Sequence, residues 1–293
     1  MNDKAQFDQQ HFDSLYPKVK FSRRSFLASS LATGFAISAG PVMAQQAIHT
    51  PATGLDVSDV KIPVAEGQIP VYCASPKKAG KFPVVIVIPE IWGLHEYQKD
   101  ICRRLAKVGY FAVSLDPYFR LGELWKLPDI KQVLAASNKL TDTQMLADLD
   151  AVVAWLEKQK KANAKKIGIT GMCRGGRTVW MYTAHSKKIK AAVSWYGSLG
   201  PIPPAMPQTP IDVTDQLNAP VLGLYGGADQ GIPLELVDRL RAGCQAFGKT
   251  CEIHVYEGMP HAFHADYRPS YRKEAAVDGW KRMLAWFRKY GVA

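Results

Sequence analysis

Short apolar runs alternate with segments of helical spacing along most of the chain. The runs are almost continuously apolar, which is typical of strands that a sheet buries on both faces. They cover residues 83–89, 110–115, 166–170, 191–196, 220–225 and 251–256. Between them, apolar residues recur three and four positions apart, which predicts helices. The predicted helices cover residues 97–109, 142–160, 174–186, 233–247 and 270–289.

Three other kinds of segment complete the pattern. Residues 58–65 and 68–74 flank a Glu-Gly pair and predict a β-hairpin at a sheet edge. Residues 120–140 are irregular, which predicts short helices in an excursion over the functional site. The proline-rich stretch 197–210 predicts a loop at the rim of a pocket. The alternation of buried strands with helices predicts an α/β fold, in which a mostly parallel central sheet carries helices on both faces.

The N-terminus has the features of a targeting signal. The pair Arg23-Arg24 precedes a Phe-Leu pair and a weakly apolar run, and Val42-Met43-Ala44 offers small-residue cleavage geometry. This pattern resembles a twin-arginine export signal, so we expect the twin-arginine export machinery as a partner and a periplasmic location. Residues 1–44 would then be a cleaved signal peptide, and residues 45–293 a single domain. The alternative is an amphipathic or disordered arm. We expect no stable membrane anchor, because serine, glycine and proline dilute the apolar run.

The overall composition excludes few classes of protein. The chain is 47% hydrophobic and 22% charged, with a formal net charge of +11. No block of five like charges and no basic-aromatic repeat occurs, so we expect no nucleic-acid partner and interpret the excess charge as a scattered, solvated surface. The sequence leaves the oligomeric state open.

Cysteine and histidine spacing predicts no metal site. The five cysteines lack C-x-x-C spacing, and His95-Glu96 has a lysine where a second histidine would be needed. A glycine-rich nucleotide fingerprint is also lacking, so we expect no cofactor. Cys244 and Cys251 can either pair or remain thiols, and the sequence leaves both possibilities open.

A glycine-rich turn at residues 171–176 is the main candidate for chemistry. It lies between a predicted strand and a predicted helix and reads G-x-C-x-G, which is the nucleophile-elbow pattern with Cys173 in the serine position. Amides at the start of the helix would favour a thiolate and could hold an oxyanion. The alternative is a buried, inert thiol in a tight turn.

Residues with ionisable or nucleophilic side chains follow several of the predicted strands, and ligands bind beyond the carboxyl ends of the strands in such sheets. The chain order Cys173, Asp229, His261 is that of the α/β-hydrolase triad. Cys173 would attack, His261 would exchange protons, and Asp229 would orient the imidazole and stabilise its cation. As alternatives, Asp229 would cap a helix and His261 would be a surface-loop residue, or His264 would replace His261.

Glu90 directly follows the most apolar strand. A carboxylate there is partly desolvated and suited to proton exchange, unless it is solvated or paired with Arg103 or Arg174. The backbone amides of Ile91 and Arg174 are the expected oxyanion donors.

At these residues the chain resembles the dienelactone hydrolase (carboxymethylenebutenolidase) family of the α/β-hydrolase superfamily. The resemblance covers roughly residues 56–291. The motifs that carry it are Pro89-Glu90-Ile91-Trp92-Gly93, Gly171-Met172-Cys173-Arg174-Gly175-Gly176, Trp195-Tyr196-Gly197, Tyr225-Gly226-Gly227-Ala228-Asp229 and His261-Ala262-Phe263. It implies that Glu90 contacts the resting cysteine and becomes its base when substrate binds.

The resemblance also implies a small-molecule substrate whose carboxylate is held by arginines. The family arginine four residues past the histidine is replaced by Ala265, with Arg268 three residues further on, and Arg120 is a candidate for the second arginine. The expected substrate-binding residues are Trp92, Arg120, Tyr196 and Arg268.

The predicted function is therefore that of a thiol hydrolase, which cleaves a small (enol-)lactone or ester through an acyl-cysteine intermediate. Two alternatives remain open: an enzyme of another class that transfers the acyl group to an acceptor other than water, and a periplasmic binding or redox-sensing protein that uses Cys173 without turnover.

Overall fold

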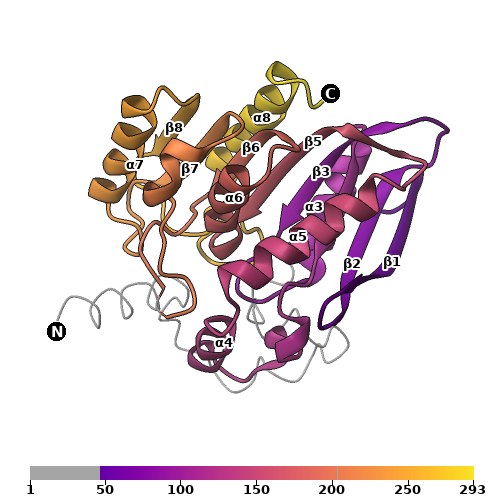
Figure 1. Cartoon of the computed structure of the whole chain (residues 1–293), viewed down its shortest axis with the longest axis horizontal. Helices are drawn as coiled ribbons and strands as arrows, with labels where there is room; N and C mark the ends of the chain where they lie inside the picture. Colours follow the sequence, from indigo (N-terminus) through magenta and orange to yellow (C-terminus); the bar gives the residue numbers. More distant parts are fainter. Residues whose placement is uncertain (1–46, 203) are drawn as a thin grey trace.

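The computed structural model describes residues 47–202 and 204–293, and the predicted signal peptide lies outside this part of the chain. The described residues form a central sheet of eight strands with helices on both faces (Figure 1). This arrangement confirms the predicted α/β fold.

The strands are β1 (Leu55–Val64), β2 (Gly67–Pro76), β3 (Phe82–Ile88), β4 (Phe111–Leu115), β5 (Ala162–Met172), β6 (Ile189–Trp195), β7 (Val221–Gly226) and β8 (Cys251–Tyr256). Their order across the sheet is β1-β2-β4-β3-β5-β6-β7-β8. The predicted hairpin, β1 with β2, pairs antiparallel at one edge, and β2 also runs antiparallel to β4. All other neighbouring strands are parallel, so their carboxyl ends share one edge of the sheet.

The helices divide between the two faces. They are α3 (Glu96–Lys107), α4 (Ile130–Ser137), α5 (Asp142–Leu156), α6 (Arg174–His185), α7 (Leu234–Ala246) and α8 (Lys273–Lys289), with short 3-10 turns at Phe119–Leu121, Leu124–Lys126 and Ile211–Gln216. In Figure 1, α5, α6 and α7 lie in front of the sheet, and α3 and α8 lie behind it. The segment 120–140 contains two of the short turns and α4, as predicted, and lies beyond the carboxyl ends of the strands (Figure 1).

Several predicted boundaries were wrong. Helix α5 ends at Leu156 and not near residue 160, and β5 begins at Ala162 and not at residue 166. The first five residues of β5 alternate in character and include Asn163 and two lysines, and only Ala162 among them is buried. They nevertheless pair with β3, Phe82 with Ala162 and Pro83 with Asn163. Strand pairing therefore extends beyond the apolar run, which a hydrophobic pattern cannot detect. The predicted start of α5 at Asp142 is confirmed. Thr141 and Gln144 form a reciprocal capping box there, which fixes the N-terminus of the helix.

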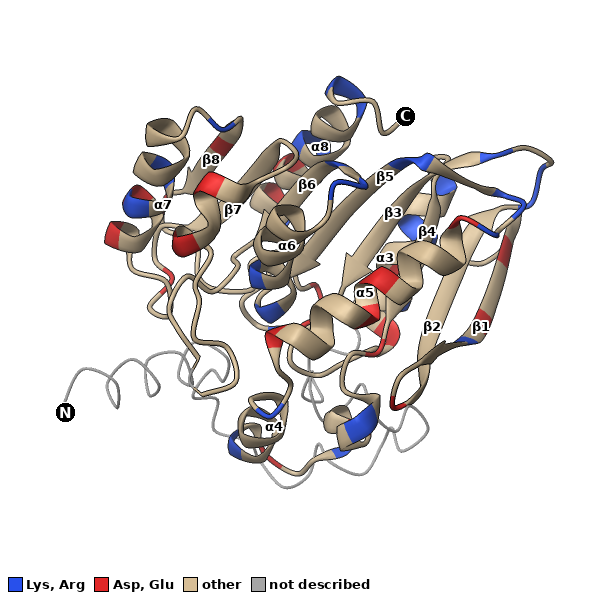
Figure 2. Cartoon of the chain, in the orientation of Figure 1, with Lys and Arg blue, Asp and Glu red and all other residues tan. Residues whose placement is uncertain are grey.

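The surface charge is less evenly spread than the sequence suggested (Figure 2). Exposed and partly exposed lysines gather at the amino ends of β3 and β5, opposite the edge that carries Cys173. Lys161 Nζ donates hydrogen bonds to the carbonyls of Pro76 and Lys77 and so ties the two lysine-rich loops together. The lysines are Lys77, Lys78 and Lys81 in the loop before β3, Lys158, Lys160 and Lys161 in the loop before β5, and Lys165 and Lys166 in the first part of β5.

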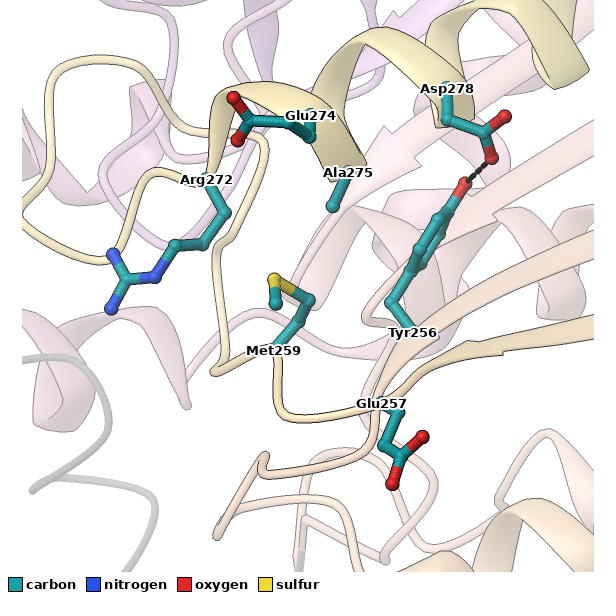
Figure 3. A pocket seen from close by; sticks show the side chains of 7 residues that line it. All are labelled: Tyr256, Glu257, Met259, Arg272, Glu274, Ala275 and Asp278. Atoms are coloured by element: carbon teal, nitrogen blue, oxygen red, sulfur yellow. Dashed lines mark hydrogen bonds between the residues drawn. The ribbon is translucent and has the colours of Figure 1, made fainter.

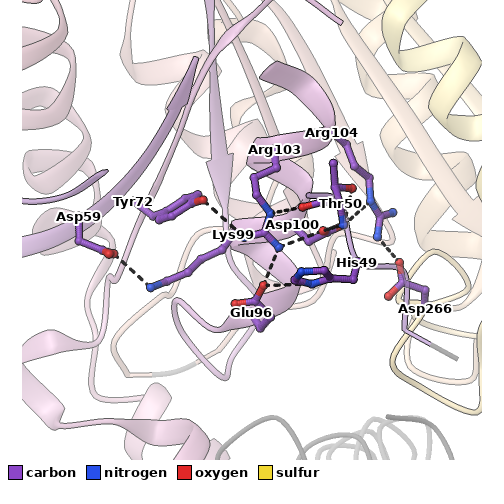
Figure 4. A network of polar contacts seen from close by, with 10 residues as sticks. All are labelled: His49, Thr50, Asp59, Tyr72, Glu96, Lys99, Asp100, Arg103, Arg104 and Asp266. Atoms are coloured by element: carbon purple, nitrogen blue, oxygen red, sulfur yellow. Dashed lines mark hydrogen bonds and ion pairs between the residues drawn. The ribbon is translucent and has the colours of Figure 1, made fainter. Parts of the chain in front are cut away.

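A network of ion pairs fixes α3 to its surroundings (Figure 4). Arg103 donates to Glu96, Asp100 and the carbonyl of Thr50. Arg104 binds Asp100 on its own helix and Asp266 in the loop before α8. The network therefore joins the segment before β1, helix α3 and the loop that carries residues 261–268.

Two further findings concern the chain as a whole. Cys244, on α7, and Cys251, on β8, form a disulfide, which settles the alternative that the sequence left open. Within residues 47–202 and 204–293, no helix has the length and apolar character needed to cross a bilayer.

Candidate active site

Cys173 lies at the sharp turn between β5 and α6. Its backbone has φ 56° and ψ −117°, a strained conformation for a residue with a side chain. The glycines around it permit this turn: a Cβ atom on Gly171 would lie 2.4 Å from the Gly175 carbonyl, and one on Gly175 would lie 2.3 Å from the Ile88 carbonyl. The first turn of α6 therefore packs directly on β3 and β5, which is the geometry of the predicted nucleophile elbow.

His261 and Asp229 meet beside this turn. His261 Nδ1 lies 2.7 Å from Asp229 Oδ2, and both side chains are completely buried. The other carboxylate oxygen accepts a hydrogen bond of 2.9 Å from the Gly231 amide, which fixes the carboxylate. Cys173 lies within hydrogen-bonding reach of His261. The structure thus brings together the three residues that the sequence placed in order.

The surroundings of His261 favour its protonated form. Burial alone lowers the pKa of an imidazole, but the charges of Asp229 and Cys173 act in the opposite direction. The combined effect raises the pKa of His261 to about 10. At neutral pH this environment can hold an imidazolium next to Cys173, and a neighbouring cation favours the thiolate, the reactive form of a cysteine.

His264 occupies a different environment. Its Nδ1 lies 2.6 Å from the Tyr97 hydroxyl, and its ring packs between Trp195 and Trp280. Burial, aided by the charge of Arg104, lowers the pKa of His264 to about 3, so it is neutral. The structure therefore pairs Asp229 with His261 and gives His264 a packing role.

Glu90 is completely buried and faces Tyr267 and Arg268. Its Oε2 accepts a short hydrogen bond from the Tyr267 hydroxyl and lies 3.5 Å from Arg268 Nη2. Arg268 Nε also donates to the Tyr267 hydroxyl, at 3.0 Å. Burial opposes the charge of Arg268, but Tyr267, Glu90 and Cys173 raise its pKa above the usual range. Glu90 is therefore paired with Arg268, and not with Arg103 or Arg174.

The two expected oxyanion donors lie on neighbouring strand ends. Ile88 and Gly171 are partners in the β3–β5 register, so Ile91 and Cys173 follow adjacent strands. Arg174 is the first residue of α6, and the amides of a first helical turn have no acceptor within the helix. Both residues therefore follow neighbouring strand ends beside Cys173, and their role as oxyanion donors stays a prediction.

Three of the four expected substrate-binding residues surround this centre. The Tyr196 ring lies 5.0 Å from that of His261, and Arg268 lies over the Trp92 ring at 5.9 Å. Arg120 does not join them in this structure. It forms a two-point ion pair with Asp148, at 2.8 and 2.9 Å, and a further ion pair with Glu66.

Several buried polar atoms at the centre lack a hydrogen-bond partner among the described residues. They are Glu90 Oε1, Trp92 Nε1, Tyr196 Oη and Arg268 Nη1. Buried polar groups are normally satisfied, so a group of unsatisfied ones indicates the place where a ligand binds. A hollow of about 330 Å³ elsewhere, between Met259, Arg272 and the start of α8, is not lined by Cys173, Asp229 or His261 (Figure 3).

Sequence reasoning missed two side chains at this centre. Tyr267 contacts both Glu90 and Arg268, and Tyr118 is buried near Cys173 and Arg174. The only sequence signal for Tyr267 was its position next to Arg268, and nothing in the pattern around Tyr118 distinguished it from a core aromatic residue. In the described part of the chain, no cluster of His, Cys, Asp and Glu could hold a metal ion.

Comparisons with known proteins agree with this geometry. The model of the dienelactone hydrolase family matches residues 69–291. A relative from Methylorubrum extorquens, provisionally named a carboxymethylenebutenolidase, is 52% identical over 96% of this chain and 97% of its own length. A relative of the same name from Salmonella typhimurium is 46% identical over 88% of this chain and 96% of its own length.

Solved structures show the same fold. The crystal structure of a provisionally assigned dienelactone hydrolase from Klebsiella pneumoniae has a TM-score of 0.78 and 46% identity. The match covers 80% of this chain and 99% of the Klebsiella chain. A dienelactone hydrolase-like promiscuous phosphotriesterase from metagenomic libraries has a TM-score of 0.69 at 19% identity. The match covers 81% of this chain and 99% of the phosphotriesterase chain, and at this identity it supports the fold alone.

Proposed function

Because this chain belongs to the dienelactone hydrolase family and is a hydrolase of ester or lactone bonds, we propose that it cleaves its substrate through an acyl-cysteine intermediate on Cys173. The substrate is a small ester or (enol-)lactone. The observation that carries the proposal is the placement of His261 between the Asp229 carboxylate and a cysteine on a strained elbow.

The first half of the reaction forms the intermediate. The Cys173 thiolate forms a C–S bond to the carbonyl carbon, and the amides of Ile91 and Arg174 stabilise the resulting oxyanion. The C–O bond to the leaving group then breaks as the oxyanion collapses. His261 gives its proton to the departing oxygen, and Asp229 stabilises the imidazolium before this transfer.

The second half releases the acyl group. Neutral His261 takes a proton from water while the water oxygen attacks the thioester carbon. The C–S bond then breaks, and the thiolate and imidazolium are restored. Because a thiolate is a good leaving group, substrates whose own leaving group is also good, such as enol esters and enol-lactones, are favoured.

Glu90 and Arg268 serve substrate entry in this proposal. A substrate carboxylate that binds Arg268 would weaken the contact of 3.5 Å between Arg268 and Glu90. Glu90 would then be free to accept a proton whenever Cys173 is present as the thiol and not as the thiolate. Its oxygen Oε1, which has no partner among the described residues, could take up this proton. Trp92 and Tyr196 would contribute the walls and hydrogen-bond donors of the binding site.

The decisive experiment replaces Cys173. Hydrolysis of p-nitrophenyl acetate or an enol-lactone should be abolished in Cys173→Ala, whereas Cys102→Ala, which removes a buried thiol on α3, should keep the activity. Intact-mass measurement during turnover should detect an acyl adduct that maps to Cys173. Undiminished hydrolysis by Cys173→Ala would refute the proposal.

The binding or redox-sensing alternative is not favoured, because the relatives are hydrolases by name and a sensor does not need Asp229 and His261. Oxidation of Cys173 by peroxide without any acyl adduct would revive it.

We also propose that the protein is exported to the periplasm by the twin-arginine route. The Arg23-Arg24 pair motivates this, and the disulfide between Cys244 and Cys251 supports it, because disulfides persist in oxidising compartments. Replacing both arginines with lysine should retain the protein in the cytoplasm, as cell fractionation would show. Unchanged periplasmic recovery would contradict the proposal.

A further inference from the structure

Two buried arginines lie beside Cys173, and they differ in their partners. Arg268 contacts the carboxylate of Glu90, as described above. Arg174 follows Cys173 in the sequence and is only 5% exposed. Its guanidinium donates to the side-chain oxygen of Asn138, at 2.6 Å from Nη2, and contacts the sulfur of Met206, at 3.6 Å from Nη1. Both of these partners are neutral.

Among residues 47–202 and 204–293, no carboxylate forms an ion pair with Arg174. The next arginine of the same helix shows how a structural cation is normally held. Arg177 binds both oxygens of Asp142, at 2.6 and 2.8 Å, and donates to the carbonyl of Gln208. Burying a guanidinium without a counter-charge costs free energy, so buried charges are usually paired. Arg174 departs from this rule, one residue away from the nucleophile.

The surroundings of Arg174 belong to the candidate site. Its charge and that of Cys173 both act on the hydroxyl of the buried Tyr118, which follows β4 at the same sheet edge. Asn138 ends α4, in the segment that lies beyond the strand ends, and Met206 lies in the proline-rich loop. The guanidinium therefore lies under the two segments that cover the carboxyl edge of the sheet. Burial lowers the pKa of Arg174, and the charges of Tyr118, Cys173 and Asp142 offset this only in part, so a bound anion would counteract the remaining effect.

We infer that the Arg174 side chain binds an anionic group of the substrate, namely a carboxylate held next to the ester carbonyl that Cys173 attacks. This assigns a second role to a residue whose backbone amide is already an expected oxyanion donor. The inference rests on the proposed function in that it places the anion in the same site. It predicts that Arg174, rather than Arg120, is the partner of Arg268 in recognising a charged substrate.

A purely structural role is the competing explanation. Arg174 could merely tie α4 to the proline-rich loop through Asn138 and Met206. A structural tie would affect charged and neutral ligands equally, whereas an anion-binding residue affects only charged ones. The test must therefore compare two ligands that differ in charge and little else.

Iodoacetate and iodoacetamide form such a pair. Each alkylates a thiolate: a C–S bond forms, the C–I bond breaks, and iodide leaves with the bonding electrons. We measure the rate for each reagent at Cys173 by peptide mass mapping and take the ratio of iodoacetate to iodoacetamide. Arg174→Gln should lower this ratio about 10-fold or more, because a charge-assisted hydrogen bond in a buried site is lost. Arg174→Lys should keep most of the ratio.

Matched controls separate the two explanations. Arg177→Gln removes an equally buried arginine of the same helix, and Asn138→Ala removes the neutral partner while leaving the charge. Both should keep the ratio of the unmodified enzyme. A ratio that is unchanged in Arg174→Gln, or that falls equally in Arg177→Gln, would overturn the inference. A fall in the ratio of iodoacetate to iodoacetamide that occurs only in Arg268→Gln would also overturn the inference.

A second measurement does not depend on thiol reactivity. Acetate, compared with acetamide at equal concentration, should raise the Tm of the unmodified protein and of Cys173→Ala, but not that of Arg174→Gln. Equal effects on all three proteins would overturn the inference. Failure of Cys173 to react with either reagent, together with this Tm pattern, would count against the proposed function and still support anion binding by Arg174.

Discussion

The ion-pair network on α3 and the centre around Cys173 are both rich in buried polar side chains, but they differ in how these are satisfied. In the network, Arg103 and Arg104 share Asp100, and each has a second acidic partner (Figure 4). At the centre, Trp92, Tyr196 and one nitrogen of Arg268 bury donors that have no partner among the described residues.

We interpret this difference as one between groups that hold the fold and groups that, under the proposed function, bind the substrate. In a satisfied network, the ion pairs and hydrogen bonds offset the desolvation free energy of the buried charges. Removing one member should therefore lower the stability of the fold. Unsatisfied donors reduce stability until a substrate occupies them, and their loss should appear in catalysis. The loop of residues 261–268 belongs to both regions, because it carries His261 at the centre and Asp266 in the network.

The largest expected effect is on catalysis at the centre. Asp229→Asn should lower kcat by roughly 10³- to 10⁴-fold, because the imidazole loses the carboxylate that orients it and stabilises its cation. The pKa of His261, held at about 10 mainly by Asp229 against the effect of burial, should also fall. Because His261 must be protonated to donate to the leaving group, the alkaline limit of kcat/KM, followed from pH 6 to 11, should move to lower pH.

The control for this variant is Asp266→Asn, which changes a carboxylate of the same loop region that faces the network. It should retain the alkaline limit of the unmodified enzyme. If Asp229→Asn keeps both kcat and that limit, the assignment of Asp229 is wrong.

The next largest expected effect is a loss of stability in the ion-pair network on α3. Arg104→Ala should lower the free energy of unfolding by about 3 kcal/mol, because Asp100 and Asp266 would remain buried without this partner. Chemical denaturation measures this change. Arg241→Ala, which removes a largely exposed ion pair with Asp238, should cost less than about 1 kcal/mol. Equal losses in the two variants would show that the network is not a structural unit.

The smallest expected effect is a loss of kcat/KM when Tyr267 is changed, because Tyr267 lies between Asp266 of the network and Glu90 of the centre. Tyr267→Phe removes the hydroxyl between Glu90 and Arg268 and should lower kcat/KM about 10-fold, because Glu90 loses a buried hydrogen bond. Tyr97→Phe is the matched control: its ring lies 5.1 Å from that of Tyr267, but its hydroxyl contacts His264. A similar loss of kcat/KM in both variants would mean that the Tyr267 hydroxyl has no specific role at Glu90.

Much of this architecture was predictable, because local patterns report how each segment is buried. The apolar runs predicted the strands from β3 to β8, and the glycines around Cys173 predicted the elbow between β5 and α6. The boundaries of α5 and β5 were wrong, since polar residues at the end of a strand can pair as readily as apolar ones. The family assignment rests on the same motifs and agrees with the relatives found by comparison.

The partners of individual charges were less predictable. Glu90 was expected to be a partly desolvated carboxylate, with solvation or a pairing with Arg103 or Arg174 as the alternatives. It is buried, as expected, but its partners are Tyr267 and Arg268, nearly 180 residues later in the chain. The lysines before β3 and at the start of β5 looked scattered, yet they form one cluster.

The sequence by itself determined the order of the strands and helices along the chain and the order of Cys173, Asp229 and His261. The tertiary structure decided which side chains meet: Glu90 with Tyr267, Arg120 with Asp148, and Arg174 with neutral partners only. The physical reason is that hydrophobic periodicity encodes burial along one segment at a time. Contacts between charges depend instead on the order of strands across the sheet and on the loops at their carboxyl ends, and these are set when distant segments pack together.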